Sequence, residues 1–381
     1  MKKSIYLIIY LIPFFNFCQI EYFDVNSEIL QDKREIKLQL PRTYNENEGQ
    51  SYPLILVFNG EYLFEPFAGI ADYLGNWDEV PEAIIVGINQ SKTKNDDFQI
   101  GEDRYLPEGR GADFFDFIEI ELIPLLEEKF RIAGFKIAVG HSRSGNFINF
   151  FLLRKSLSFN GYISLSPLLS KKMPDRIINA LKTKETKLFY YLANAENDFE
   201  SARKRTSTLA DSLMKIDNPK AEISYDQIKK TTHFTMVSRS IPLAIEKMFS
   251  VYRPITPSVY EKKLLESDNI IDYLEEKYMK IEDLYALEVP IRINDIFFAA
   301  KAIKEKEKWD ALKDLSKIAE KNHPNKILGN YYLALHFEKI GKPKKAIKYY
   351  EAAAYGYEEV ENITKDKVLD KANELKELFG Y

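Results

Sequence analysis

A serine placed between small residues is the part of this chain best suited to nucleophilic chemistry. It lies in the run Gly140-His141-Ser142-Arg143-Ser144-Gly145, which follows an apolar stretch at 137–139 and opens a helical pattern. A strand, a sharp turn and a helix are the setting in which a G-x-S-x-G string forms a nucleophile elbow. The fifth position departs from that string, because Ser144 stands there and glycine comes one residue later. Serine is small enough for the turn, so we predict Ser142 to be a nucleophile.

A serine hydroxyl needs a neighbouring base to take its proton, and histidine is the usual choice near neutral pH. The chain has four histidines: His141, His233, His323 and His336. Strand alternation is expected to direct His141 away from its neighbour Ser142, and the last two histidines lie in a different region. His233 follows the last strand candidate and precedes a helix. We therefore predict His233 to be the base.

The acid that orients the histidine should come between serine and histidine in chain order. Two carboxylates, Glu196 and Asp198, follow the strand candidate at 187–193. Either could accept the second N–H of the imidazole. We favour Asp198, with Glu196 as the alternative. The competing role for Asp198 is that of N-cap for the helix predicted at 199–215.

The oxyanion that develops during acyl transfer needs two backbone donors. One is the amide of Arg143, which follows the nucleophile. The other is expected in the loop after the first buried strand, where the amide of Glu61 or of Tyr62 is the candidate. The side chains of Arg143 and Arg104 could also bind an anionic group of a substrate, although solvated salt bridges are the competing explanation for both.

Length, composition and charge limit the number of domains and the kinds of partner to be expected. The chain has 381 residues, of which 45% are hydrophobic and 29% charged, and this length favours two domains. Its formal net charge of −4 gives no reason to expect nucleic acid or an anionic membrane as a partner.

The first residues are typical of a signal peptide. Two lysines precede an apolar stretch at 5–15 that is too short to span a bilayer comfortably. We predict a signal peptide at 1–18, hence a periplasmic or secreted protein with no stable membrane span. Lipid anchoring at Cys18, the single cysteine, is disfavoured because Phe17 and Phe15 occupy positions where a small residue and leucine are wanted.

Strand and helix patterns alternate from about 30 to 250. The strand candidates are 35–40, 54–58, 83–88, 136–139, 161–165, 187–193 and 222–226. The helix candidates are 112–129, 145–155, 174–182, 199–215 and 242–252. This alternation predicts an α/β domain over 19–254 with a mostly parallel sheet flanked by helices. The polar stretch 89–111 is expected to be a long loop near the substrate.

A helical region with a 35-residue repeat is predicted over 258–381. The matched positions are Phe298, Ala299, Ala311, Leu315 and Ile318 in one copy, and Leu333, Ala334, Ala346, Tyr350 and Ala353 in the next. The region resembles tetratricopeptide (TPR) repeats, in which small residues allow helices to approach closely. A protein partner for this region is a second possible role.

Residues 30–252 resemble the esterase D and enterochelin-esterase-like esterases of the α/β-hydrolase superfamily. The resemblance is carried by 52–60, 114–131, Gly140-His141-Ser142 and Thr232-His233-Phe234. It implies an α/β-hydrolase fold and hydrolysis of carboxylic esters through an acyl-enzyme, without a metal or organic cofactor. Known members act on siderophore, feruloyl, acetyl-xylan and S-formylglutathione esters, so a small-molecule, carbohydrate or siderophore ester is expected.

Two alternatives remain open at this point. The α/β domain could be a catalytically degenerate scaffold whose helical tail binds a protein, or the enzyme could be an acyltransferase. The sequence offers no histidine-rich or cysteine-rich cluster for a metal and no glycine-rich phosphate loop after the first strands.

Overall fold

A computed structural model describes residues 20–355 and 357–381, so the predicted signal peptide with Cys18 lies outside the described residues. The chain divides into two compact units. The first runs as far as Asn76 and continues with Glu82–Ile132 and Lys136–Met248; the second comprises Trp77–Pro81, Ala133–Phe135 and Phe249–Tyr381. In the described ranges, no helix combines the length and apolar character needed to cross a bilayer.

An eight-stranded sheet forms the centre of the first unit, in the order β1-β2-β4-β3-β5-β6-β7-β8. The strands are β1 (Glu21–Ser27), β2 (Asp32–Gln39), β3 (Tyr52–Val57), β4 (Ile84–Ile88), β5 (Ile132–His141), β6 (Gly161–Leu165), β7 (Leu188–Asn197) and β8 (Ala221–Thr232). β1, β2 and β4 pair antiparallel, and every later pairing is parallel. The predicted mostly parallel sheet is confirmed. The continuous apolar runs of β3 and β4 are fully buried, as expected of strands covered on both faces.

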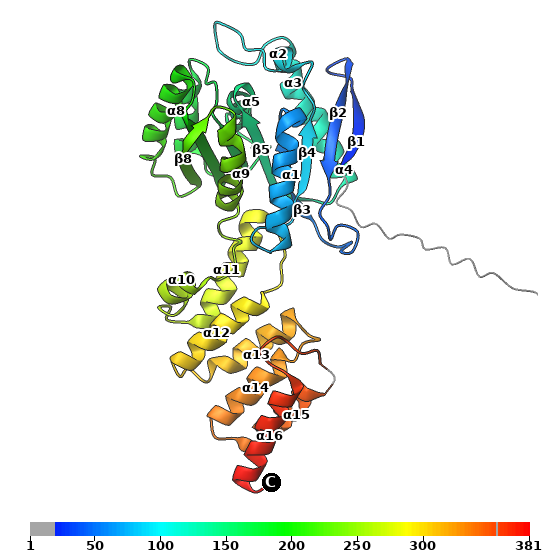
Figure 1. Cartoon of the computed structure of the whole chain (residues 1–381), viewed down its shortest axis with the longest axis vertical. Helices are drawn as coiled ribbons and strands as arrows, with labels where there is room; N and C mark the ends of the chain where they lie inside the picture. Colours follow the sequence, from blue (N-terminus) through cyan, green and yellow to red (C-terminus); the bar gives the residue numbers. More distant parts are fainter. Residues whose placement is uncertain (1–19, 356) are drawn as a thin grey trace, which may run out of the picture. The chain divides into compact units, whose positions relative to one another are not determined.

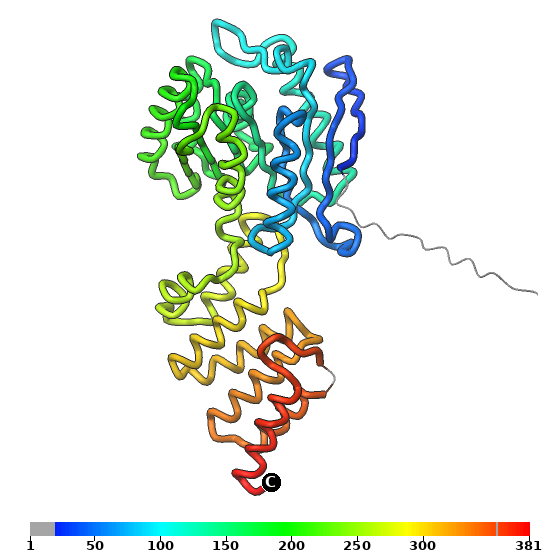
Figure 2. Tube along the Cα trace, in the orientation of Figure 1, coloured from blue at the N-terminus to red at the C-terminus, as the bar shows by residue number. Residues whose placement is uncertain are grey.

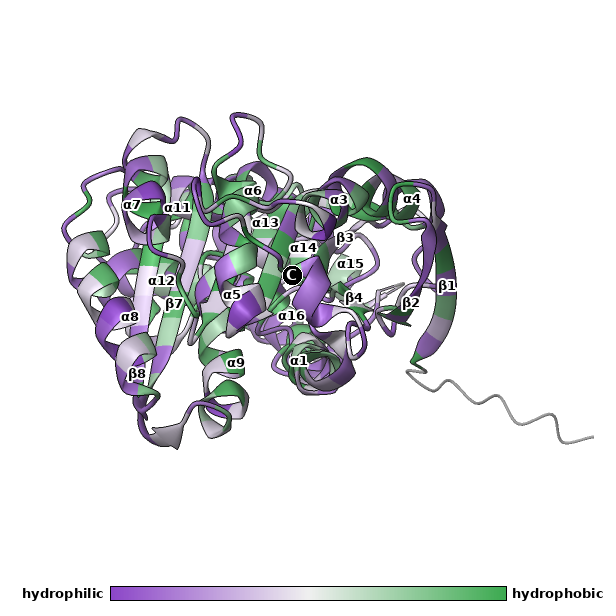
Figure 3. Cartoon of the chain, turned by 90° about the horizontal axis from the view of Figure 1, so that it is seen from above, coloured by the Kyte–Doolittle hydropathy of each residue, from purple (hydrophilic) through white to green (hydrophobic). Residues whose placement is uncertain are grey.

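Helices cover both faces of this sheet (Figure 1). They are α1 (Gly60–Asn76), α2 (Lys94–Asp97), α3 (Arg110–Asp116), the π-helical segment η1 (Phe117–Leu122), α4 (Ile123–Lys129), α5 (Arg143–Phe147), α6 (Asn149–Leu152), α7 (Met173–Thr183), α8 (Glu200–Leu213) and α9 (Thr235–Met248). Seen from above, α1 and α9 lie on one face, and α3, α4, α6 and α7 lie on the other (Figure 3). Because β3 to β8 run parallel, their carboxyl ends lie at the same edge of the sheet. Ligands bind at this edge in open α/β sheets.

Helix α1 was not predicted, because Pro66 and Gly69 interrupt its sequence pattern. The helix nevertheless buries one face, which includes Phe64 and Phe67. A Cβ added to Gly87 of β4 would lie 2.6 Å from the ring of Phe64, so the helix and the sheet approach closely at this glycine. Tertiary packing outweighs the weak local propensity here.

The second unit contains successive helices. They are α10 (Pro257–Val259), the π-helical segment η2 (Tyr260–Leu264), α11 (Ile270–Tyr285), α12 (Ile293–Glu305), α13 (Ala311–Asn322), α14 (Leu328–Lys339), α15 (Pro343–Ala354) and α16 (Lys365–Phe379). From α12 to α16 each helix packs on the next, and the trace in Figure 2 follows them in turn. Ala299, Ala334, Ala346 and Ala353 are buried between these helices. The helical region is confirmed, while its relation to TPR repeats stays a prediction.

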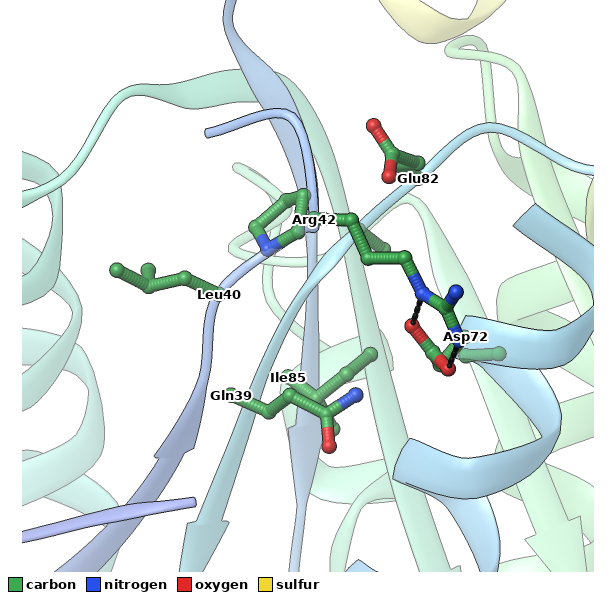
Figure 4. Close-up of a pocket in the computed structure, with 9 residues that line it drawn as sticks. Gln39, Leu40, Arg42, Asp72, Glu82 and Ile85 are labelled. Atoms are coloured by element: carbon green, nitrogen blue, oxygen red, sulfur yellow. Dashed lines mark hydrogen bonds and ion pairs between the residues drawn. The ribbon is translucent and has the colours of Figure 1, made fainter. Parts of the chain in front are cut away.

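A small pocket lies beside the end of β2 and α1 (Figure 4). It encloses about 10 Å³, room for roughly one water molecule. Arg42 in its wall donates to both carboxylate oxygens of Asp72, at 2.7 and 2.5 Å. Because Arg42 is paired with Asp72 and the free volume is so small, this pocket offers no space for a substrate.

Candidate active site

Ser142 lies in a strained turn at the carboxyl end of β5. Its φ of 60° and ψ of −115° are a conformation that residues other than glycine rarely adopt. The N–H of Ser142 donates to the carbonyl of Leu165 at 3.0 Å, and its carbonyl accepts from the N–H of Leu168 at 2.9 Å. The last residue of β6 and the segment that follows it therefore hold both backbone groups of Ser142. Helix α5 begins at the next residue, as a nucleophile elbow requires.

The two small residues that flank the serine close this turn. A Cβ on Gly140 would lie 2.5 Å from the backbone carbon and oxygen of Ser144, so only glycine fits. The buried Oγ of Ser144 accepts from the N–H of His141 and donates to the carbonyl of His141, both at 2.9 Å. The departure at the fifth position thus supplies a hydroxyl that ties the helix start back to the end of the strand.

His233 and Asp198 form a buried pair at the ends of neighbouring strands β8 and β7. Nδ1 of His233 lies 2.7 Å from Oδ1 of Asp198, and the two side chains are 4% and 0% exposed. Burial alone raises the pKa of Asp198, but the hydrogen bonds from His233 and Ser166 outweigh it and bring the pKa below its usual range. Because an ionised carboxylate only accepts, Nδ1 of His233 donates to it and Nε2 is left as the basic nitrogen.

The two candidate acids contact different groups. Oε2 of Glu196 accepts from the N–H of Lys230 at 2.7 Å, and Oε1 lies 3.5 Å from Nζ of Lys229. The structure therefore brings Asp198, and not Glu196, to His233. Helix α8 has Phe199 as its N-cap, with no capping bond from a side chain. The carboxylate of Asp198 accepts from the imidazole and from the N–H of Phe199 at 2.8 Å, and Phe199, not Asp198, occupies the N-cap position.

His141 lies in the site, contrary to the expectation that strand alternation directs it away. It lines the same cleft as Ser142, and its ring centroid is 4.5 Å from that of His233. Nδ1 of His141 lies 3.0 Å from the hydroxyl of Tyr62, and Nε2 lies 3.1 Å from the carbonyl oxygen of His233. Burial, and then the nearby His233, lower the pKa of His141 to about 4. Its place at the last residue of the strand, where alternation gives way to the turn, was the signal in the sequence.

The predicted oxyanion donors lie in the first turns of two helices. Glu61 is the second residue of α1 and Arg143 the first of α5, positions whose N–H groups have no acceptor within the helix. The amide of Tyr62, the other candidate, donates to the carbonyl of Asn59 at 3.1 Å. The N–H of Asn59 itself donates to Oε1 of Gln90 at 3.0 Å.

Gln90 connects this turn to a buried ion pair. Its Nε2 donates to Asp97 at 3.0 Å, and Asp97 also accepts from Arg34 at 3.0 Å. Burial raises the pKa of Asp97 despite these bonds and one from Thr93. Since Asp97 ends α2, the network ties the loop at 89–111 to the turn that carries Asn59.

An open cleft of about 610 Å³ lies over Ser142. It is lined by Asn59, Tyr62, Lys94, Asn95, Phe98, His141, Ser142, Arg143 and Phe234. The aromatic side chains make most of the surface apolar, and Lys94 and Arg143 add positive charge at one side. Arg143 also donates to Oδ1 of Asn95 at 2.6 Å. Arg104 does not line the cleft; its carbonyl accepts from Arg176 at 2.6 Å on the outer part of the loop.

No metal site can be assigned within residues 20–355 and 357–381, because no three His, Cys, Asp or Glu side chains there are arranged so that they could hold a metal ion. The candidate residues are Ser142 in the cleft and the His233–Asp198 pair, which adjoins the cleft through the ring of His141. This arrangement can perform proton transfer and nucleophilic attack with groups of the chain itself.

A family model described as "Putative esterase" matches residues 27–326. The chain belongs to this esterase family. No curated protein matches it. The chain is similar to the crystal structure of an uncharacterised protein from Capnocytophaga ochracea, with a TM-score of 0.85 and 27% identity over 94% of this chain and 100% of the other.

Two more distant structures share the fold of this chain. An IroE-like serine hydrolase from Shewanella oneidensis gives a TM-score of 0.61 at 19% identity, over 79% of this chain and 99% of the other. The BES protein from Bacillus cereus gives 0.53 at 20% identity, over 65% and 97%. The predicted resemblance to α/β-hydrolase esterases is therefore confirmed at the level of family and fold.

Proposed function

We propose that this protein hydrolyses carboxylic esters through an acyl-enzyme on Ser142. The observation that carries the proposal is the buried Asp198–His233 pair, whose histidine packs against the residue preceding a strained serine. Nε2 of His233 takes the proton from the hydroxyl of Ser142 as Oγ attacks the ester carbonyl. The amides of Arg143 and Glu61 donate to the resulting oxyanion.

The remaining steps follow from the same groups. Protonated His233 gives its proton to the departing alcohol oxygen, which leaves the acyl group on Ser142. A water molecule then loses a proton to Nε2 and attacks the acyl carbon, and collapse of the second tetrahedral intermediate releases the acid. Asp198 stays ionised throughout and stabilises the imidazolium in its orientation.

The cleft favours esters with an apolar or aromatic part. Tyr62 and Phe234 line it and are 42% and 69% exposed, so they offer apolar area to a ligand. Lys94 and Arg143 would favour a substrate with an anionic group beside the ester. Acetylated and feruloylated sugars and a catecholate siderophore ester are the substrates to screen, with alcohol acceptors present so that acyl transfer is detected by product analysis.

Replacing Ser142 with alanine tests the nucleophile. The S142A variant is expected to lose hydrolysis of a short p-nitrophenyl ester and labelling by a fluorophosphonate, because no other group is placed to form the acyl-enzyme. S144A is the matched control, since it removes the neighbouring hydroxyl and leaves Ser142. Unchanged activity or labelling in S142A would refute the assignment.

Substitutions of Asp198 and Glu196 provide a second matched pair of variants. Asp198→Asn should lower kcat by about 10⁴-fold, since an amide stabilises the wrong imidazole tautomer. Glu196→Gln should stay within about twofold, because Glu196 contacts only the backbone and lysines of the neighbouring turn. A larger loss in E196Q than in D198N would reassign the acid.

A further inference from the structure

His141 is a buried histidine of the cleft that the chemistry above does not use. The carbonyl oxygen of His233 can only accept, so Nε2 of His141 must carry the proton of the 3.1 Å bond between them. Nδ1 then accepts from the hydroxyl of Tyr62 at 3.0 Å. The low pKa of about 4 keeps the ring neutral near neutral pH and preserves this single tautomer.

We infer that His141 is a positioning residue that holds the backbone of His233 through a relay from Tyr62. In this relay the Tyr62 hydroxyl donates to His141, and His141 donates to the carbonyl of His233. The inference rests on the proposed function, since its purpose is to keep the base within reach of Ser142. It assigns a role to the residue directly before the nucleophile.

The position of His233 in the chain explains the need for such support. Only His233 and Phe234 separate the end of β8 at Thr232 from the start of α9 at Thr235. Asp198 holds the ring at Nδ1, and the N–H groups of Thr232 and Thr235 each donate to the hydroxyl of the other across the turn. None of these bonds ties the turn to β5. The bond from His141 attaches that backbone to the strand that carries Ser142. Ser142 and the backbone of His233 are thereby both attached to strand β5.

The surroundings of His141 favour this role over ordinary core packing. Its ring meets the rings of Tyr62, His233 and Phe234 at centroid distances of 5.9, 4.5 and 6.2 Å. Both of its nitrogens have partners, and one partner is the backbone of the proposed base. The ionisable groups that face it are Tyr62, His233 and, through His233, Asp198.

Two substitutions separate the nitrogens of His141. Glutamine places an amide N–H near the position of Nε2, whereas asparagine reaches only as far as Nδ1. His141→Asn should lower kcat for a p-nitrophenyl ester by about 30- to 100-fold, the loss expected when a catalytic group moves by about 1 Å. KM should change by no more than about twofold, since binding contacts are kept. His141→Gln should stay within about fivefold of the wild type, as expected for loss of one neutral hydrogen bond.

The same variants are compared by fluorophosphonate labelling and proton NMR. The labelling rate should fall in H141N in parallel with kcat. The low-field resonance of the His233 Nδ1 proton should be present in the wild type and H141Q, and lost or broadened in H141N. Equal kcat and spectra for H141N and H141Q, with both variants folded by circular dichroism, would overturn the relay. A wild type with the resonance but no esterase activity or labelling would refute the proposed function alone, because the spectra test the relay independently.

Discussion

Two turns of the first unit, at Asn59 and at Ser142, use one backbone device for different purposes. Each follows a buried strand, each residue has positive φ (55° and 60°), and each starts a helix. Their strands β3 and β5 are parallel neighbours in which Val57 pairs with Val139. The Ser142 turn presents a hydroxyl, whereas the Asn59 turn presents backbone amides. Adjacent strand ends can thus bring the proposed nucleophile and the proposed oxyanion donors to one edge of the sheet without a long loop.

The two turns differ in what holds them. The Ser142 turn is held by backbone bonds to Leu165 and Leu168 and by the hydroxyl of Ser144. The Asn59 turn is held by the side chain of Gln90, by the side chain of Glu61, which accepts from the N–H of Gln90, and by the bonds that the Asn59 carbonyl accepts from Tyr62 and Leu63. The Ser142 turn requires small residues, and they form a recognisable string in the sequence. The bond from the N–H of Asn59 to Gln90 joins residues far apart in the chain, so it leaves no local pattern. The comparison explains why one turn was found as a motif and the other only by its position after a strand.

Adding a methyl group to each turn should give the largest effects. A Cβ on Gly140 would meet backbone atoms of Ser144 at 2.5 Å, and a Cβ on Gly60 would meet backbone atoms of Ile88 at 2.8 Å. Each clash should cost about 1–3 kcal/mol of unfolding free energy. Gly140→Ala should also lower kcat at least about 100-fold, since it moves Ser142. Gly60→Ala should lower kcat about tenfold or more by displacing an oxyanion donor.

Gly49→Ala is the control for both glycines. A Cβ on Gly49 meets nothing within 4 Å, so the variant should match the wild type in kcat and in urea unfolding. If G140A retained wild-type kcat, the steric account of the Ser142 turn would be wrong. If G60A changed stability alone, the Asn59 turn would not contribute to catalysis.

The Ser142 turn should also be sensitive to acid through His141. Its pKa of about 4 in the folded chain lies below the 6.5 of an unfolded chain, so the unfolded state binds more protons between these values. Stability should fall as the pH drops from about 6.5 to about 4, by at most about 3 kcal/mol. Urea unfolding at pH 7, 5.5 and 4.5 measures this loss. H141Q lacks the titrating group and should show a smaller slope; identical slopes would contradict the assignment.

Removing Gln90 should weaken the Asn59 turn selectively. Gln90→Met keeps the shape of the buried side chain but leaves the N–H of Asn59 and one oxygen of Asp97 without this partner. We expect a loss of about 1–3 kcal/mol in stability for the unsatisfied groups. The fall in kcat should be up to about tenfold, because the donors shift while Ser142 stays in place. Fluorophosphonate labelling and p-nitrophenyl ester kinetics measure it, and a Q90M enzyme with normal kcat would show that the turn holds itself.

Strands with continuous apolar runs could be predicted from the sequence. Elements that form because of strand pairing or packing against the sheet could not. The strands at 54–58 and 83–88 were recognised because burial on both faces leaves a nearly continuous apolar run. Strand β1 was missed because it is a largely exposed edge strand, defined by its pairing with β2. Helix α1 was missed because of Pro66 and Gly69, although apolar residues recur along it at helical spacing.

The site was predictable in its chain order and less so in its contacts. Chain order favoured Asp198 and kept Glu196 as the alternative, and the structure shows that it is Asp198 that meets His233. Ser166 was not foreseen: it follows β6 with a φ of 40° and donates its hydroxyl to Asp198. His141 was set aside by an alternation rule that fails at the last residue of a strand. These contacts depend on strands brought together by the sheet, which no local pattern records.

Replacing Ser144 should give the smallest effect and tests the local support of the Ser142 turn. Ser144→Ala removes two hydrogen bonds to the backbone of His141 and should cost about 1 kcal/mol of unfolding free energy. Ser144→Gly restores the common fifth residue of the elbow string but should cost about 1 kcal/mol more, because glycine is unfavourable within α5. Urea unfolding ranks the three proteins. If S144A were as stable as the wild type, the hydroxyl would not be what closes this turn, and the contrast with the turn held by Gln90 would fail.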